Sequence, residues 1–365
     1  MIFLIPAILF FVYFFCLISL WIGLKNLSQC SQPELHHVSI IVAMKNEEIN
    51  VRFCLDALVN QNYPSKLFEI IIVDDGSSDG TPLILNEYQQ KYPFISVIKT
   101  GQTPSVSSSK KQALNKAIKK SSGQILIFTD ADCVPPVNWV SKMVSCFEPQ
   151  VGLAAGFSPE IDPINSTFGK ILELDSLAAG IVAAGSIGRN KAVTCTGRNI
   201  AYRREVFAQI NGFEEIMGSV SGDDDLFLQL VKNKTNWKIK YTTQIETIVP
   251  SFQTKSFAGF YRQKKRHLSA GKYYNFKIQI GYFLFHLANL GFFLCFLILL
   301  FSGKFFILSL SFLLFKFLAD WFLLKSGSQK FNLTFTLPIF LLWEVFFLTY
   351  HLVIGPASWF GKIRW

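Results

Sequence analysis

Two aspartates, Asp130 and Asp132, follow directly after four apolar residues, Ile125 to Phe128. Four apolar residues in a row predict a short strand buried on both faces, as in a parallel sheet. Residues i and i+2 of an extended chain point to the same side, so both carboxylates are expected beyond the carboxyl end of the strand, where open parallel sheets bind ligands. Adjacent carboxylates repel unless a proton or cation lies between them, and hard oxygen ligands that share a cation with a phosphate suit Mg²⁺ or Mn²⁺. The alternative interpretation is a loop with two solvated aspartates.

A second acidic segment also follows a predicted strand. The strand is Glu69 to Val73, and it runs straight into Asp74 and Asp75 and the turn-forming Gly-Ser-Ser sequence. Carboxylates at the carboxyl end of a strand can accept hydrogen bonds from the N–H and O–H groups of a base and a ribose. The alternative is an N-cap for the helix predicted over Leu83 to Tyr92, and one segment can serve both purposes.

Three consecutive acids, Asp223, Asp224 and Asp225, precede the helical pattern that starts at Leu226. The helix dipole favours anions at this position, so simple capping explains the acids as well as a catalytic role does. Adjacent carboxylates raise one another's pKa, which suits a group that takes a proton from a hydroxyl near neutral pH. The sequence leaves both interpretations open.

The acidic segments lie within a region in which strands alternate with helices. Val38 to Ala43 and Ile95 to Lys99 read as further strands, Lys110 to Lys120 reads as a helix, and Thr100 to Ser109 is loop-like. This alternation predicts an open α/β sheet. Neither the Gly-x-Gly-x-x-Gly pattern of dinucleotide-binding folds nor a P-loop occurs there.

Apolar segments flank this region on both sides. The chain is 50% hydrophobic with a mean hydropathy of +0.33, too apolar for an ordinary soluble protein. Residues 1–24 carry no charge and are long enough to cross a bilayer, while a cleaved signal peptide would have a basic start and a small-residue cleavage site. Three more apolar runs follow: Ile280–Phe301, Phe305–Leu324 and Leu333–Ile354. Lys316 and Asp320 lie four residues apart in the middle run, so on a helix they can pair.

Basic residues gather just before the second apolar segment. Seven of them occur with no acid among them: Lys255, Arg262, Lys264, Lys265, Arg266, Lys272 and Lys277. By the positive-inside rule this end of the span, and the domain attached to it, is cytoplasmic. The net charge of +10 then favours membrane lipids or a phosphorylated substrate as partner, and no nucleic acid. Four spans would place the basic residues of the C-terminus on the opposite side, so either the last run is re-entrant or its local charge is overridden.

The seven cysteines are scattered and form no Cys-x-x-Cys pair. We expect neither a zinc site nor a disulfide framework from this spacing, and scattered thiols suit a reducing cytoplasm.

Together the motifs resemble glycosyltransferase family two, whose nucleotide-sugar domain has the GT-A fold. In chain order the resemblance rests on Asp74-Asp75-Gly-Ser-Ser-Asp79-Gly-Thr, Lys110-Lys-Gln-Ala-Leu-Asn115, Asp130-Ala-Asp132, Thr196-Gly197-Arg-Asn199 to Phe207, Gly222-Asp223-Asp224-Asp225-Leu226 and Gln263-Lys-Lys-Arg266-His267. The last motif is similar to the Gln-x-x-Arg-Trp motif of membrane synthases, with His267 in place of Trp. The resemblance covers about residues 38–270.

The resemblance implies a role for each motif. It implies a GT-A domain with an open mixed, mostly parallel sheet, and an inverting transfer in which Asp224 is the base and Asp223 takes the usual Glu position. The donor, a nucleotide-diphosphate sugar, would contact Asp74, Asp75, Lys110, Asp130, Gln263 and Arg266. Asp132 and Asp130 would hold Mg²⁺ or Mn²⁺, and Gly197 and Asn199 would lie on the side of a lipid-linked or glycan acceptor.

We therefore predict an integral membrane protein of the inner or plasma membrane with three parts. These are a transmembrane anchor (1–24), a cytoplasmic GT-A domain (36–275) and C-terminal transmembrane helices (278–356). One alternative is a membrane-anchored nucleotidyltransferase, although the segment from Ala43 to Glu48 is acidic and has no glycines where that class has a basic phosphate-binding loop. Another alternative is a non-catalytic nucleotide-sugar-binding protein or a channel.

Overall fold

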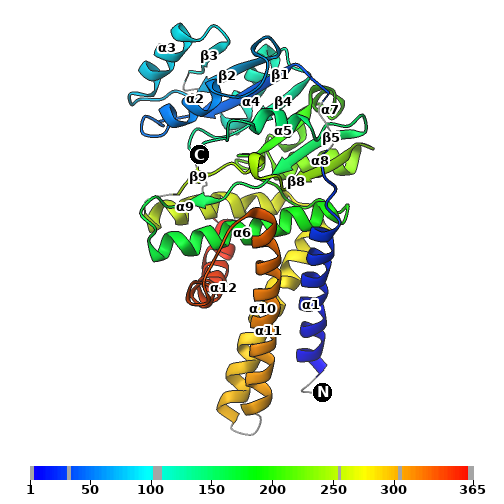
Figure 1. Ribbon diagram of the computed structural model, residues 1–365. Helices are drawn as coiled ribbons and strands as arrows, with labels where there is room; N and C mark the ends of the chain where they lie inside the picture. The colour runs from blue at the N-terminus through cyan, green and yellow to red at the C-terminus, as the bar shows by residue number, and fades with distance from the viewer. Residues whose placement is uncertain (1–3, 31–33, 102–108, 254–255, 303–305, 361–365) are drawn as a thin grey trace.

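The computed structural model describes residues 4–30, 34–101, 109–253, 256–302 and 306–360. A sheet flanked by helices forms one end of the molecule, and long helices extend from it at the other end (Figure 1). The predicted loop Thr100 to Ser109 lies largely outside the described residues. Where the structure describes the chain, the strand predictions are confirmed. The strands that were predicted to begin at Ile95 and at Ile125 have the predicted bounds in the structure.

The main sheet has seven strands in the order β3-β2-β1-β4-β7-β5-β8. Their bounds are β1 (Val38–Met44), β2 (Phe68–Asp74), β3 (Ile95–Lys99), β4 (Ile125–Phe128), β5 (Val151–Gly156), β7 (Ile200–Arg203) and β8 (Lys238–Thr242). β7 runs antiparallel to both of its neighbours, β4 and β5, and every other pairing in this sheet is parallel. The predicted mixed, mostly parallel sheet is therefore confirmed.

Helices cover both faces of the sheet, which is why all residues of β1, β4 and β5 are buried. Ile40 of β1 belongs to a core with α2 (Val51–Val59), α3 (Thr81–Lys91) and α5 (Trp139–Val144). Its neighbour Ile41 points to the opposite face, as alternation along a strand requires, and joins the core that contains α4 (Ser109–Lys120) and α8 (Asp225–Lys234). That second core continues into the long helices.

Four long apolar helices, one N-terminal and three C-terminal, follow the predicted pattern. They are α1 (Leu4–Lys25), α10 (Phe276–Ser302), α11 (Phe306–Phe331) and α12 (Leu337–Trp359). A fifth long helix, α6 (Thr167–Gly188), was not singled out by the sequence analysis. Among the described residues, α1, α6, α10 and α12 contain segments that are long and apolar enough to cross a membrane. The helix α6 is two-thirds buried beneath the sheet because it packs against α1, α11 and α12. The remaining helices of the domain are α7 (Arg204–Gln209) and α9 (Phe257–Ser269).

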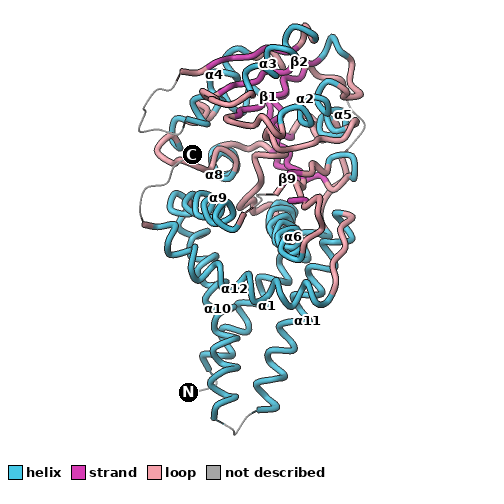
Figure 2. The backbone as a smooth tube through the Cα atoms, turned by 90° about the vertical axis from the view of Figure 1, so that its left-hand side faces the viewer, coloured by secondary structure: helices cyan, strands magenta, loops and turns pink. Residues whose placement is uncertain are grey.

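The helix α12 differs from the other long helices in direction. In both views α10 and α11 run together away from the sheet, while α12 crosses beneath it (Figures 1 and 2). Lys272, just before α10, donates a hydrogen bond to the carbonyl of Trp359 at the end of α12 (2.8 Å). Six residues before α12 begins, the ring of Phe331 stacks on Phe157 of the sheet domain, with centroids 4.5 Å apart. Both ends of α12 therefore lie on the side of the domain, as expected for the re-entrant alternative.

Two of the cysteines form a disulfide, which corrects the prediction that no disulfide occurs. Cys30, after α1, is bonded to Cys146, after α5. The spacing of 116 residues gave no signal, because only the fold brings the end of α1 beside this part of the sheet domain.

The helices α1 and α6 touch through their backbones. A Cβ atom added to Gly23 of α1 would lie 1.8 Å from the carbonyl oxygen of Gly185 in α6, and one added to Gly185 would lie 2.7 Å from the carbonyl oxygen of Leu20. Small residues allow such close approach between apolar helices. This contact holds the N-terminal helix against the floor of the domain.

We predict that Gly23→Leu lowers the free energy of unfolding by about 1–3 kcal/mol, because the added side chain overlaps the backbone of α6. Thermal unfolding in detergent measures the effect. Gly281→Leu is the matched control, because no atom lies within 4 Å of a Cβ added there and the helix propensity gained is the same. Equal melting temperatures for the two variants would contradict the proposed close contact.

Candidate active site

A cavity of about 1880 Å³ lies between the sheet and the long helices. Most of the residues predicted to act on donor or acceptor line it: Lys110, Asp130, Asp132, Gly197, Asp223, Asp224, Gln263 and Arg266. These residues come from β4, α4, the segment before β7, the start of α8 and α9. The fold thus brings together groups that are up to 156 positions apart in the sequence, from Lys110 to Arg266.

Lys110 connects the two predicted groups of acids. Its ammonium nitrogen lies 3.1 Å from a carboxylate oxygen of Asp130 and 3.1 Å from one of Asp223. Burial alone would lower the pKa of Lys110, but the nearby charges of Asp130, Asp223 and Asp224 raise it. Lys110 is therefore a permanent cation between the end of β4 and the loop before α8. The neighbouring Lys111 supports the same loop, because its ammonium donates to the carbonyl oxygens of Ser219 and Ser221.

Asp132 lines the same cavity as Asp130. Burial, and then the charge of Asp130, raise the pKa of the Asp132 carboxyl, and the guanidinium of Arg198 partly opposes that shift. One Asp132 oxygen accepts a weak hydrogen bond from the thiol of Cys133 (3.3 Å). Two hard oxygen donors this close fit a divalent cation that takes its remaining ligands from water and substrate phosphates. No group of three or more His, Cys, Asp and Glu that could hold a metal occurs in the described part of the chain, so a cage made by the protein alone is not what the residues offer.

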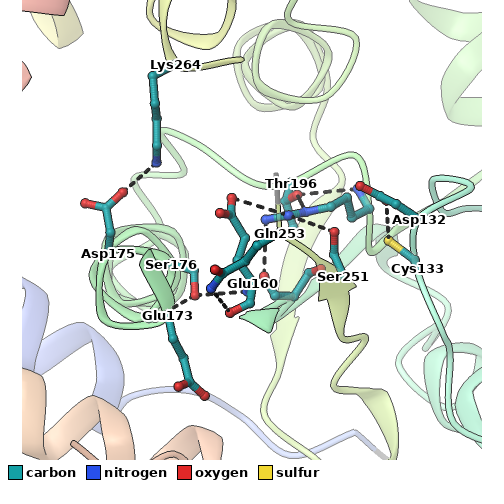
Figure 3. Close-up of polar contacts among 12 residues, drawn as sticks. Asp132, Cys133, Glu160, Glu173, Asp175, Ser176, Thr196, Ser251, Gln253 and Lys264 are labelled. Carbon is teal, nitrogen blue, oxygen red and sulfur yellow. Dashed lines mark hydrogen bonds and ion pairs between the residues drawn. The ribbon is translucent and has the colours of Figure 1, made fainter. Parts of the chain in front are cut away.

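Arg198 is a partly buried cation of the cavity that the sequence analysis left unassigned. Its guanidinium donates to the hydroxyl of Ser251 (3.1 Å) and the carbonyl of Ser158 (3.3 Å) and lies 3.5 Å from Glu160. Figure 3 shows Glu160 and Ser251 close together, with Asp132 beyond Thr196. In the sequence Arg198 lies between Gly197 and Asn199, two residues predicted to lie on the acceptor side. This position is the sequence signal that could have identified it as a site residue.

Glu47 is a second cavity residue that the sequence analysis left unassigned. Burial raises the pKa of its carboxyl to about 7, with smaller contributions from Asp132 and Asp130, while a hydrogen bond from Asn50 opposes the shift. It follows β1, whose carboxyl end lies beside that of β4 in the sheet. In the sequence analysis, the acidic segment that contains Glu47 served only as an argument against a phosphate-binding loop.

Each of the three consecutive aspartates has a different set of partners. Asp223 pairs with Lys110, as described above. Asp224 is the N-cap of α8: its two oxygens accept from the backbone N–H of Asp225 (2.8 Å) and of Gly197 (2.7 Å). Asp225 accepts from the hydroxyls of Thr194 and Tyr274 (2.6 and 2.5 Å). Capping and a position in the cavity therefore occur together in Asp224.

The same surroundings shift these carboxyls in opposite directions. Burial, and then the charges of Asp225 and Asp223, raise the pKa of Asp224 to about 8. Burial would also raise the pKa of Asp223, but the ammonium of Lys110 outweighs it and lowers the value. Asp224 therefore tends to carry a proton while Asp223 carries a negative charge. Closely spaced pairs of acids that exchange protons show the same division.

Three of the predicted residues do not line this cavity. Asp74 accepts from the backbone N–H of Ser77 (2.9 Å), a turn contact. Asp75 accepts from the hydroxyl of Thr100 (2.7 Å), and its other oxygen is buried without a partner in the described structure, as expected of an acceptor that awaits a ligand. Asn199 is fully buried, and its amide bonds to Trp139 and to two backbone carbonyls. Its role on the acceptor side stays a prediction.

The helix α9 carries Gln263 and Arg266 into the cavity, and the carbonyl oxygen of the Gln263 side chain is buried without a hydrogen-bond partner among the described residues. Lys264 fixes this helix, because its ammonium bonds to Asp175 of α6 (2.5 Å), as Figure 3 shows. The other Asp175 oxygen accepts from Tyr350 of α12 (3.1 Å). His267, at the position of the family's Trp, lies exposed on the same helix and also lines the cavity.

Comparisons with known proteins agree with this geometry. Residues 39–210 match the family model described as Glycosyl transferase family 2, and residues 125–350 match Glycosyl transferase family group 2. A probable glycosyltransferase, YdaM of Bacillus subtilis, is 30% identical over 188 residues, which are 51% of this chain and 44% of that protein. A beta-monoglucosyldiacylglycerol synthase of Trichormus variabilis is 28% identical over 57% of this chain and 44% of its own length. The chain thus spans less than half the length of these two relatives.

Among solved structures, a mannosyltransferase from Pyrobaculum calidifontis, PcManGT, in complex with GDP-Man and Mn²⁺, superposes with a TM-score of 0.55. The alignment covers 97% of this chain and 94% of that chain at 17% identity. This similarity shows a common fold, and it includes the long helices as well as the sheet domain.

The raised pKa of Asp224 makes stability depend on pH. Between its ordinary value of 3.8 and about 8, the folded protein holds a proton on Asp224 that the unfolded chain has lost, so the free energy of unfolding falls as pH rises through this window. Asn cannot ionise, so we predict that Asp224→Asn melts at a higher temperature than the wild type at pH 8. The expected shift is about 2–4 °C for each kcal/mol gained in the free energy of unfolding. At pH 4 we expect no such increase.

Asp162→Asn is the control for this measurement. Hydrogen bonds from Ser166 lower the pKa of that carboxyl, so its loss should act in the opposite direction, destabilising at pH 8. An equal effect of Asp224→Asn at both pH values would contradict the assigned shift.

Proposed function

Because this chain belongs to glycosyltransferase family 2, we propose that it is a membrane-bound inverting enzyme that moves a sugar from a nucleotide-diphosphate sugar to a hydroxyl of a lipid or growing glycan acceptor. The observation that carries the proposal is the double contact of Lys110. It holds a donor-side acid, Asp130, and an acceptor-side acid, Asp223, within one cavity. Glycosyl transfer needs these two groups within reach of one another.

The donor would occupy the end of the cavity beside the sheet. Asp75 does not line the cavity, but its free buried oxygen is suited to accept from a base or ribose that extends beyond it. Arg266 of α9, which does line the cavity, is suited to a diphosphate because its planar guanidinium can donate two parallel hydrogen bonds. Asp132 and Asp130 would hold Mg²⁺ or Mn²⁺. When bound there, the cation would stabilise the negative charge that develops on the leaving diphosphate.

The acceptor hydroxyl would be deprotonated by Asp224. A base works best when its pKa lies near the working pH, and burial together with Asp225 and Asp223 brings Asp224 there. The N–H of Gly197 keeps the carboxylate in place. In this proposal Asp223 does not act as the base, because its contact with Lys110 favours the charged, weakly basic form.

We predict that Asp132→Ala and Asp224→Asn impair different steps. Asp132→Ala should lose donor affinity and turnover together, and chelation by EDTA should reproduce the loss of affinity. Asp224→Asn should lower turnover by about 10²- to 10⁴-fold, the usual contribution of a general base, and change donor affinity by less than about tenfold. Calorimetry with Mn²⁺ and a radiolabelled transfer assay in detergent, screened over nucleotide sugars, measure the two quantities.

Asp162→Asn, which lies outside the cavity, is the control and should leave both quantities unchanged. Unchanged donor binding in EDTA would remove the metal from the proposal. Normal turnover per bound donor in Asp224→Asn would remove this residue as the base. A large loss in Asp223→Asn, with none in Asp224→Asn, would move the base by one position.

Orientation in the membrane is a further part of the proposal. The helix ends beside the sheet domain carry Lys25, Lys272, Lys277 and Lys330, whereas the described residues at the opposite ends of α1, α10 and α11 carry no charge. This asymmetry favours a cytoplasmic domain. The Cys30–Cys146 disulfide is the opposing observation, because disulfides are rare in reducing compartments.

We predict that green fluorescent protein fused after Asn275, or after the C-terminal Trp365, is fluorescent in a bacterial host, since both ends of α12 lie on the domain side. Alkaline phosphatase fused after Ser302 should be active, because α10 ends at the far side. Active phosphatase after Asn275 would place the domain outside, in agreement with the disulfide and against the basic residues.

A further inference from the structure

We propose that the part of the cavity among the long helices binds the sugar head of a glycolipid, which is the acceptor of the reaction. The inference rests on the proposed function and makes its acceptor specific: a lipid whose head carries several hydroxyls, and neither a lipid phosphate nor a lipid with a single hydroxyl. The observations that lead to it lie outside the acids and bases considered so far.

The cavity extends from the candidate active site into the helix group. Besides Asp130 and Asp224, its lining includes Tyr13 of α1, Asn289 of α10, Lys316 of α11 and Glu344 of α12. A cavity of about 1880 Å³ is larger than the 300–1,000 Å³ usual for a drug-sized ligand, so room remains beside a bound nucleotide sugar. A second reactant therefore fits within the same enclosure.

A buried polar cluster lies at the helix end of this cavity. The ammonium of Lys316 bonds to carboxylate oxygens of Asp320 (2.8 Å) and Glu344, and the hydroxyl of Tyr13 bonds to Asp320 (2.7 Å). All four side chains are at least nine-tenths buried. With one cation shared by two carboxyl groups, the cluster has no surplus positive charge to offer the phosphate of a lipid phosphate.

Two buried oxygens beside the cluster have no hydrogen-bond partner in the described structure. One is the second carboxylate oxygen of Glu344 (2% exposed) and the other is the amide oxygen of Asn289 (3% exposed). Asn289 faces the cluster, because Phe285 and Phe292, one turn to either side of it on α10, both pack on the ring of Tyr13 at 5.3 Å. An unpaired buried acceptor costs about 1–3 kcal/mol, so both oxygens call for O–H or N–H donors from a ligand.

A ligand with one hydroxyl does not meet this need. Its only O–H would be given to Asp224, where transfer takes place, and the oxygens of Glu344 and Asn289 would stay unpaired. A sugar head brings one hydroxyl to the base and keeps others for the cluster. The head of a glycolipid therefore carries O–H donors for the cluster in addition to the one that reacts.

Aromatic side chains line the same part of the cavity. The rings of His286 and His351 stack with centroids 4.3 Å apart, and Phe347 lies 4.2 Å from His351. Such rings combine an apolar face with polar edges, as a sugar ring combines C–H faces with hydroxyls. This lining suits a sugar better than it suits a nucleotide phosphate.

The cavity also reaches the outer apolar surface of the helices. Four of its lining residues are large and exposed: Phe15 of α1, Phe283 and Leu287 of α10, and Leu352 of α12. Acyl chains can leave the cavity across these side chains without crossing polar surface. This favours a glycolipid over a soluble glycan as the source of the sugar.

The test is a transfer assay with the full-length protein in phospholipid vesicles. Separate vesicle samples contain dioleoylglycerol, monoglucosyl-dioleoylglycerol or a polyprenyl phosphate, and a further sample receives a soluble glucose oligosaccharide instead. The nucleotide sugar is the one found active in the screen described above. We expect transfer to the glucosyl lipid at least about tenfold faster than to the other three, because each unmet hydrogen bond in a buried site costs about 1–3 kcal/mol.

Asn289→Leu and Glu344→Gln then test the two oxygens. Each should raise the KM for the glucosyl lipid roughly 10- to 100-fold and leave hydrolysis of the nucleotide sugar without acceptor within twofold. Ser311→Leu is the control, because Ser311 is exposed on α11 and does not line the cavity. Thermal unfolding of each variant accompanies the kinetics.

Distinct results would overturn the inference. Equal or faster transfer to the polyprenyl phosphate or to dioleoylglycerol would refute the sugar head, and equal transfer to the oligosaccharide would refute the lipid. A lower melting temperature with an unchanged KM in both variants would mean that the cluster only holds the helices together. If no nucleotide sugar is hydrolysed or transferred under any condition, the proposed function itself fails, which is a different result from these.

Discussion

Lys110 bonds to two carboxylates that reach it from opposite halves of the chain, and the candidate active site depends on this pair of contacts. Without the ammonium, Asp130 and Asp223 would repel across the cavity, and Asp223 would lose the charge partner that keeps its pKa low. Asp224, one residue on, has no such partner and keeps its proton to about pH 8. A single cation thus keeps Asp223 charged, while its neighbour Asp224 stays able to act as a base.

The long apolar helices form part of this site. Asp175, buried on α6, accepts from Lys264 of α9 and from Tyr350 of α12, so the helix that brings Gln263 and Arg266 into the cavity is fixed by the apolar helices. Since α12 starts and ends beside the domain, it closes the cavity from below. A sheet domain cut away from these helices would lose one wall of the site.

Burial determines which polar groups in the helices are informative. Lys316 bonds to Glu344 of α12, and Asp320 accepts from Tyr13 of α1, so these two groups are satisfied by contacts that hold helices together. Glu344 and Asn289 differ, because each keeps a buried oxygen without a partner in the described structure. An unsatisfied acceptor that faces a cavity indicates the chemistry of the missing ligand, whereas a satisfied pair does not.

The sequence by itself determined strands β1 to β4, the N-terminal and C-terminal apolar helices and most of the residues that meet in the cavity, because short apolar runs, uncharged segments and acids at strand ends are local patterns. The tertiary structure decided what depends on distant contacts. It joined Cys30 to Cys146 against expectation, buried Asn199 and gave Arg198 a place beside Asp132. It also gave each of three adjacent aspartates its own partner: Lys110 for Asp223, Gly197 for Asp224 and Tyr274 for Asp225. The three aspartates are consecutive, so the sequence alone does not distinguish them. Their pKa values differ because different groups fold against each one.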